Sequence, residues 1–216
     1  MIKDRKPKIL SIVDTINSRI SEINDLFRTG PELYFYKRLM QLRRECHDIT
    51  SFLDNTYFME ILYATLVSWD MNSRGAKMKY LDEFVLNLRS CKDEFKTLDS
   101  INQELSFQSF PFQVLERTYE KLNLMKSGGR LVSNSKLLHF LFPCILMPMD
   151  RQNTLSYFYG NTNESIHKYL ELVRVQFEII AQKVDWSHLV DDKWNQTVPK
   201  LIDNAVILLA GKSLTA

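Results

Sequence analysis

Two charged residues stand at the ends of an apolar segment that runs from Leu131 to Arg151. Lys136 precedes the apolar residues, and Asp150 follows them directly after Pro148 and Met149. A lysine amine is a nucleophile once it is deprotonated, and a carboxylate is a general acid or base. Each residue also has a structural alternative. Lys136 would be a first-turn lysine that extends its ammonium to water, and Asp150 would be the N-cap of the next helix.

The rest of the chain contains no competing catalytic motif. It has no glycine-rich phosphate loop, no GxSxG and no HExxH. Cys46, Cys91 and Cys144 are far apart and form no CxxC pair, so the sequence supports neither a disulfide framework nor a zinc or iron–sulfur site. We therefore expect no metal and no cofactor. His139 lies three residues after Lys136 on the same helix face, and the simplest interpretation is a hydrogen-bonded core or interface histidine.

The elements that position these residues are predicted to be helices. Apolar residues recur at steps of three and four along most of the chain, and no alternating run is bounded by a hairpin turn. Caps and breakers divide the pattern, with Asn55 or Asp54, Asp150 and Asn163 as starts, and Gly160 as a stop. The expected helices cover about 9–27, 31–44, 55–69, 78–100 (one helix or two), 111–125, 135–142, 151–159, 163–184 and 199–210, with a loop at about 70–77.

Length and composition fit one globular unit of 216 residues, with 45% hydrophobic and 25% charged residues. We predict an all-α fold of about nine or ten helices in two lobes. One lobe would combine about 1–54 with 151–216, and the other would be about 55–150. The net charge of +2 is too small to predict nucleic-acid binding by itself, although it leaves room for a local basic patch. We see no signal peptide and no membrane span, so we expect a cytoplasmic protein without a membrane partner.

Two separated stretches resemble the helix–hairpin–helix DNA glycosylase superfamily. The stretch FMEILYATLVSWDMNSRGAK, at 58–77, is similar to an early central helix of that family, which ends in Leu-x-Ser before a polar loop. Later, LVSNSK stands where the family has its hairpin and the lysine of its lyase-active members. LLHFLF is similar to the apolar helix that follows, and Pro148-Met149-Asp150 to the closing motif. The same region also resembles a signature, SK-x-LH…P-x-DR, of uncharacterised helical prokaryotic proteins.

The resemblance implies an all-helical body of two lobes with a cleft, and duplex DNA as a partner. Lys136 would attack the sugar C1′ and form a Schiff base, and Asp150 would stabilise the cationic sugar or activate the nucleophile. Backbone amides around Ser133, Asn134 and Ser135 would hold a DNA phosphate. The remaining implied residues are Arg130 and Arg151 for DNA binding, and Trp69, Asp70, Asn72 and His139 for the base pocket.

The chain also departs from the family's pattern. Ser133 and Ser135 replace the hairpin glycines, the glutamine common after Leu-x-Ser is absent, and the iron–sulfur cysteines of one branch are missing. Serine tolerates a left-handed backbone poorly, which weakens the case for a close phosphate approach. The sequence thus leaves open whether the protein is an enzyme. The alternative is a non-enzymatic helical interaction domain whose protein partners are unknown.

Overall fold

The protein is all-helical in the computed structural model, which describes residues 5–27, 29–46, 48–72, 77–104 and 110–211. This confirms the predicted fold class, although the described part of the chain contains twelve α-helices and two π-helical turns rather than nine or ten helices. They are α1 (Arg5–Ser18), α2 (Ile20–Asn24), α3 (Pro31–Glu45), α4 (Ile49–Asp54), α5 (Thr56–Leu66), η1 (Val67–Met71), α6 (Leu81–Arg89), α7 (Lys92–Glu104), α8 (Phe112–Lys121), α9 (Leu131–Leu141), η2 (Arg151–Leu155), α10 (Ser156–Tyr159), α11 (Ile166–Ile180) and α12 (Val198–Leu209).

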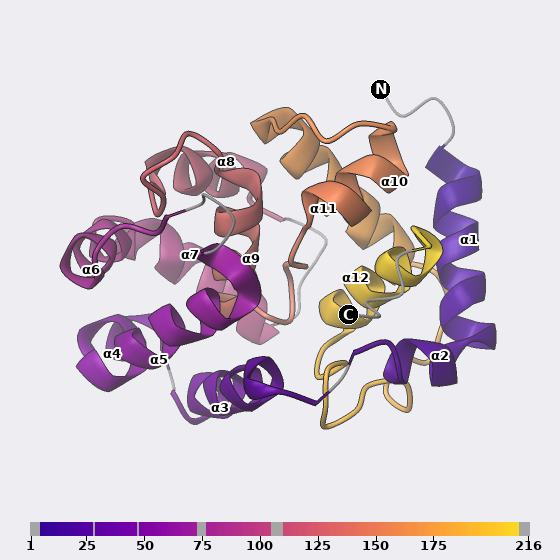
Figure 1. The fold of residues 1–216 in the computed structure, drawn as a ribbon, viewed down its shortest axis with the longest axis horizontal. Helices are drawn as coiled ribbons and strands as arrows, with labels where there is room; N and C mark the ends of the chain where they lie inside the picture. The colour runs from indigo at the N-terminus through magenta and orange to yellow at the C-terminus, as the bar shows by residue number, and fades with distance from the viewer. Residues whose placement is uncertain (1–4, 28, 47, 73–76, 105–109, 212–216) are drawn as a thin grey trace.

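The helices form two groups that lie side by side in Figure 1. The terminal group contains α1, α2, α10, α11 and α12, and the central group contains α3 to α9. Helices α3 and α4, which we expected with the N-terminal residues, pack instead on α5 and α7. The reason is the apolar surface of α5, which needs cover on several sides, and α3 supplies it with its own buried stripe.

One hydrophobic core runs through both groups, and buried residues from nearly every helix contribute to it. α9 lies at the centre of the molecule, where it contacts α3 and α5 in its own group and α11 in the other. Nine of its eleven residues are buried. No helix among the described residues combines the length and the apolar character needed to cross a membrane.

Local capping signals account for several helix ends. The side chain of Asn55 accepts a hydrogen bond from Phe58 N at the start of α5, and Gly160 ends α10 with a φ of 67°, in the left-handed region that favours glycine. Other predicted ends were wrong. α11 begins after Ser165 rather than Asn163, and the first helix ends at Ser18. Residues 73–76 of the predicted loop lie outside the described part of the chain.

Candidate functional site

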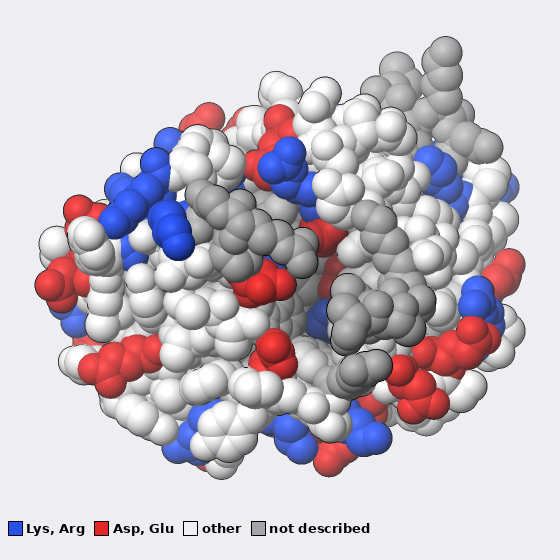
Figure 2. All heavy atoms as spheres, in the orientation of Figure 1, with Lys and Arg blue, Asp and Glu red and all other residues white. Residues whose placement is uncertain are grey.

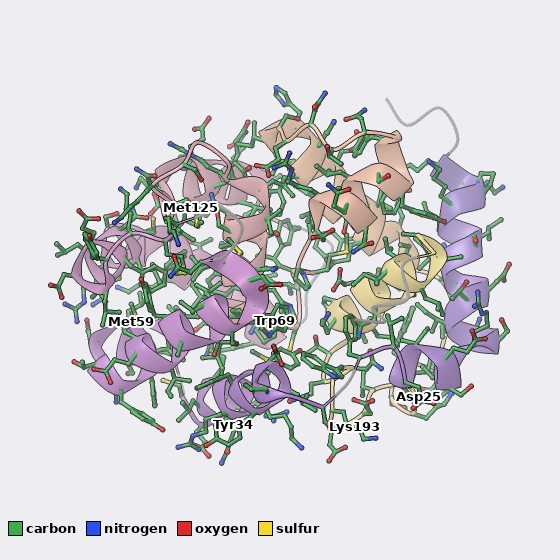
Figure 3. The ribbon with its side chains drawn as sticks, in the orientation of Figure 1. Asp25, Tyr34, Met59, Trp69, Met125 and Lys193 are labelled. Atoms are coloured by element: carbon green, nitrogen blue, oxygen red, sulfur yellow. The ribbon has the colours of Figure 1, made fainter. Side chains whose placement is uncertain are left out.

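A cavity of about 400 Å³ lies where the two groups of helices meet. Figure 2 shows this face hollowed near its centre, and Figure 3 places Trp69 there, between the groups. Its volume is within the range of ligand pockets, roughly 300–1,000 Å³. The lining residues are Phe27, Glu32, Ser68, Trp69, Asp70, Lys136, Pro148, Met149, Asp150, Asn153, Trp194, Lys200, Asp203 and Ile207. Four of the predicted site residues, Lys136, Asp150, Trp69 and Asp70, therefore line one cavity.

Lys136 reaches the cavity from α9. Its side chain is partly buried, and Nζ donates a hydrogen bond of 2.6 Å to the backbone oxygen of Trp69. The same ammonium lies 5.8 Å from the centre of the Trp69 ring, within reach of a cation–π interaction. The bond to Trp69 crosses from α9 to η1, so it fixes the amine against the wall of the cavity.

Burial lowers the pKa of Lys136 below its ordinary value. The carboxylates of Asp150 and Asp203, and that of Asp70, act in the opposite direction because they stabilise the charged amine. Lys200 adds a smaller contribution that lowers the pKa. A larger share of Lys136 is therefore the neutral amine at neutral pH than is the case for an exposed lysine, and only the neutral amine is a nucleophile.

Asp150 caps η2, as predicted. One oxygen, Oδ1, accepts a hydrogen bond of 2.8 Å from Asn153 N, and the backbone N–H of Asp150 donates to Thr154 Oγ1 at 3.0 Å. Ser135 ties this segment to α9, because its hydroxyl accepts a hydrogen bond of 3.0 Å from Met149 N. Ser135 directly precedes Lys136, so this contact brings the lysine and the aspartate to the same cavity.

The π-helical turn η1 presents Trp69 and Asp70 to the cavity. Asp70 has a φ of 64°, a left-handed conformation that non-glycine residues seldom adopt. Three residues of the lining also carry buried polar atoms for which the described structure offers no hydrogen-bond partner: Nε1 of Trp69, Nε1 of Trp194 and Oδ1 of Asn153. Strained backbone concentrates at functional sites. An unpaired buried polar atom is uncommon and needs an explanation, such as a partner supplied by water or a ligand.

A second lysine–aspartate pair, absent from the sequence-based site, lines the same cavity. Lys200 and Asp203 are 3% and 4% exposed, and Lys200 Nζ donates to Asp203 Oδ2 at 2.7 Å and to Asn204 Oδ1 at 2.6 Å. The ammonium also lies 5.2 Å and 5.1 Å from the ring centres of Phe27 and Trp69. Burial raises the pKa of Asp203, and Lys200 opposes that shift. The sequence does carry a signal for this pair. Lys200, Asp203 and Asn204 stand at i, i+3 and i+4, which places three polar side chains on one face of the otherwise apolar α12.

The predicted phosphate site around Ser133, Asn134 and Ser135 does not form as expected. α9 begins at Leu131, about four residues before the predicted start, so these three residues lie inside the helix and are buried. The amide of Asn134, for example, donates to Arg130 O at 2.8 Å. The amides at the true N-terminus, those of Arg130 and Leu131, donate to Glu164 Oε2 at 2.9 and 3.0 Å, so a carboxylate of the chain itself occupies the position.

The two arginines of the predicted DNA surface have partners within the chain. Arg130 Nη1 donates to Glu120 O at 3.1 Å, and Arg151, which is exposed, lies 3.6 Å from Glu164 Oε1 through Nε. The first contact ties the residue before α9 to α8, and the second ties η2 to the segment before α11. Neither arginine lines the cavity.

Two members of the predicted base pocket lie away from the cavity lining. Asn72 is exposed, and its Oδ1 accepts a hydrogen bond of 3.3 Å from Met78 N. His139 is fully buried, with Nδ1 2.8 Å from Leu146 O and Nε2 3.3 Å from Tyr36 Oη. Burial lowers the pKa of His139 to about 3, so the ring is neutral near pH 7, donates through Nδ1 and accepts through Nε2. It is a core histidine.

Substitutions at Asp150 distinguish its role as a helix N-cap from the effect of its negative charge on stability. Asparagine caps about as well as aspartate, while alanine costs about 1 kcal/mol. We expect Asp150→Asn to change the melting temperature by no more than roughly 2 °C, and Asp150→Ala to lower it by roughly 2–4 °C. Differential scanning calorimetry of the three proteins measures this. Equal destabilisation by asparagine and alanine would show that the charge, rather than the cap, stabilises the fold.

The cavity thus combines residues of both groups of helices. Lys136 and Trp69 come from the central group, while Lys200 and Asp203 come from α12 in the terminal group. Among the described residues, no group of three or more histidine, cysteine, aspartate or glutamate side chains is arranged to hold a metal ion. No protein-family model, no curated protein and no solved structure matches this chain.

Proposed function

We propose that this protein is a DNA-binding repair protein of the DNA glycosylase or abasic-site lyase type, with Lys136 as its nucleophile. The observation that carries the proposal is the shared cavity: a lysine whose pKa is lowered by burial lines the same 400 Å³ space as Asp150. The cavity lies between two groups of helices, the arrangement that the sequence resemblance implied. Strongly perturbed titratable groups in a cleft favour a functional site over a structural one.

The covalent step uses groups that the cavity supplies. The neutral amine of Lys136 donates its electron pair to C1′ of the deoxyribose, and the base leaves with the electrons of the glycosidic bond and takes a proton. The ring oxygen then leaves C1′ and takes a proton to become the C4′ hydroxyl, while the nitrogen lone pair forms the C=N bond of a protonated Schiff base. Asp150 accepts the proton that the amine loses or stabilises the cationic sugar.

The aromatic lining suits a base that has left the stack of a duplex. The rings of Phe27, Trp69 and Trp194 line the cavity, and Trp69 and Trp194 have ring centres 6.1 Å apart. Enzymes that act on an extruded base hold it between aromatic or apolar side chains. Glu32, Asp150 and Asp203 also line the space, so base and sugar, which carry no negative charge, fit it better than phosphate does. The phosphates of the DNA would remain outside.

The alternative is a helical interaction domain without catalysis. Its support is that Lys136 and Asp150 both have structural contacts, the first with Trp69 O and the second as the cap of η2. Such contacts are compatible with a catalytic role too, because active-site residues need positioning. Only reactivity separates the two proposals.

The test is capture of the Schiff base. Wild-type protein is incubated with a duplex that carries one abasic site, or one oxidised base, in the presence of sodium borohydride. Borohydride delivers a hydride to the C=N carbon and leaves a stable amine, so we expect a protein–DNA adduct that survives denaturing electrophoresis. An undamaged duplex is the control and should give none. Absence of an adduct with every damaged duplex, and of any base release, would reject the enzymatic proposal and favour the interaction domain.

A further inference from the structure

Two extended segments of the central group place three lysines on one surface. Residues 77–80 and 122–126 pair in antiparallel fashion, since Lys79 N donates to Leu124 O at 2.9 Å and Lys126 N to Lys77 O at 2.8 Å. Side chains alternate across extended backbone. Met78 is buried in the core, so Lys77 and Lys79 project away from it. Lys77 and Lys126 are exposed, and Lys79 is half-buried.

None of these three lysines forms an ion pair with a described carboxylate. Lys126 Nζ lies instead 3.5 Å from the ring centre of Tyr80, whose side chain is 70% exposed. Lys37 on α3, by contrast, forms an ion pair with Asp192. Figure 2 shows lysine and arginine side chains gathered at the upper left of this face, in the region where Figure 3 labels Met125.

Asparagine side chains connect this surface to the elements that line the cavity. Asn72, directly after η1, accepts from Met78 N at 3.3 Å. Asn134 of α9 donates through Nδ2 to Tyr119 O at 3.1 Å and to Leu122 O at 3.4 Å, at the start of the second lysine-bearing segment. The elements that carry Trp69 and Lys136 are therefore tied to the two segments that carry the lysines.

We infer that Lys77, Lys79 and Lys126, here called the lysine surface, bind the phosphate backbone of duplex DNA while a damaged nucleoside occupies the cavity. The inference rests on the proposed function. Unpaired ammonium groups attract phosphates, and the carboxylates of the cavity require the phosphates to bind elsewhere. The exposed ring of Tyr80 holds Lys126 in place for that contact. Arg130 and Arg151, first predicted for this role, contact oxygen atoms of the chain itself. None of the three lysines forms an ion pair with a carboxylate in the described part of the chain.

The test compares two triple variants that lose the same charge. Lys77→Gln/Lys79→Gln/Lys126→Gln removes the lysine surface, and Lys37→Gln/Lys92→Gln/Lys96→Gln removes three lysines of α3 and α7. The probe is a fluorescein-labelled duplex with a tetrahydrofuran abasic-site analogue, which cannot form a Schiff base. Its affinity is measured by anisotropy between about 50 and 200 mM salt.

Affinity should depend less on salt when the lysine surface is removed. Each lost phosphate contact reduces the slope of log K against log[salt] by about 0.9, so three contacts reduce it by about 2.7. We expect the control triple to keep a slope close to that of the wild type. Equal slopes for the two triples, or a wild type that does not bind the duplex at low salt, would overturn the inference.

Borohydride capture on a true abasic duplex tests the proposed function separately from the salt dependence of binding. The lysine-surface variant should form the adduct at high DNA concentration, with a raised half-saturating concentration, because Lys136 is intact. An adduct together with equal slopes would reject the lysine surface and leave the proposed function standing. The opposite outcome is also informative. If only the lysine-surface variant loses salt-dependent duplex binding and the wild type forms no adduct, the lysine surface binds DNA but the proposed Schiff-base reaction is rejected.

Discussion

Replacing Lys136 with methionine should abolish the borohydride-trapped adduct completely, without unfolding the protein. The Schiff base needs a primary amine at this position, and methionine has similar length and no amine. Burial opposes the charge on Lys136, as its lowered pKa indicates, so removing the charge relieves that cost. The lost bond to Trp69 O offsets part of the gain. We expect a melting temperature equal to that of the wild type or higher.

The trapped adduct also has to be located, because other amines of the chain can react. Lys200 lines the same cavity, although its ammonium is occupied by Asp203 and Asn204. Digestion of the wild-type adduct followed by mass spectrometry should find the sugar remnant on Lys136. A remnant on Lys200 or on the terminal amine, or an adduct that persists in Lys136→Met, would disprove the assignment of the nucleophile.

The helices could be predicted from sequence because their signals are local. Apolar periodicity identifies a buried face, and Asn55, Asp150 and Gly160 mark ends through bonds or dihedral angles within a few residues. Where two nearby residues of capping type compete, as at Asn163 and Ser165, the residue type alone does not decide which of them begins the helix. The start of α9 depends on Glu164, more than thirty positions later in the chain, and no local pattern reveals that contact.

The candidate site, like the helices, could be predicted only in part. Lys136 and Asp150 are conspicuous because they interrupt apolar sequence, and both line the cavity. Lys200 and Asp203 were missed because a lysine three residues before an aspartate is typical of an exposed helical ion pair. Their burial depends on how α12 packs against the rest of the chain, and on the rings of Phe27 and Trp69. The spacing of two residues in the sequence does not predict such contacts between distant parts of the chain.

Removing the carboxylate of Asp99 should cause a large loss of stability. Asp99 forms a buried ion pair with Arg43, and both side chains are 5% exposed. Its Oδ2 also accepts from Ile49 N at 3.0 Å, and Arg43 Nε donates to Leu141 O at 2.8 Å. The pair therefore joins α3, the start of α4, α7 and the end of α9, which carries Lys136.

Breaking such a pair leaves a buried charge without compensation, which costs roughly 3–5 kcal/mol. We expect Asp99→Ala to lower the free energy of unfolding by that amount, and the melting temperature by roughly 6–20 °C for a chain of this size. Urea denaturation followed by circular dichroism measures the first quantity. The control is Asp54→Ala, which breaks the exposed pair with Lys92 and should cost no more than about 1 kcal/mol.

The double variant Arg43→Met/Asp99→Leu distinguishes the charge from the packing. It removes both charges together, so no ion is left unpaired, and buried ion pairs replaced by apolar residues of similar volume are often tolerated. Ile49 N still loses its acceptor, which costs roughly 1–3 kcal/mol. We therefore expect the double variant to be more stable than Asp99→Ala and less stable than the wild type. If it is as unstable as Asp99→Ala, the pair stabilises the fold through shape and hydrogen bonds, and the unpaired charge is not the cause.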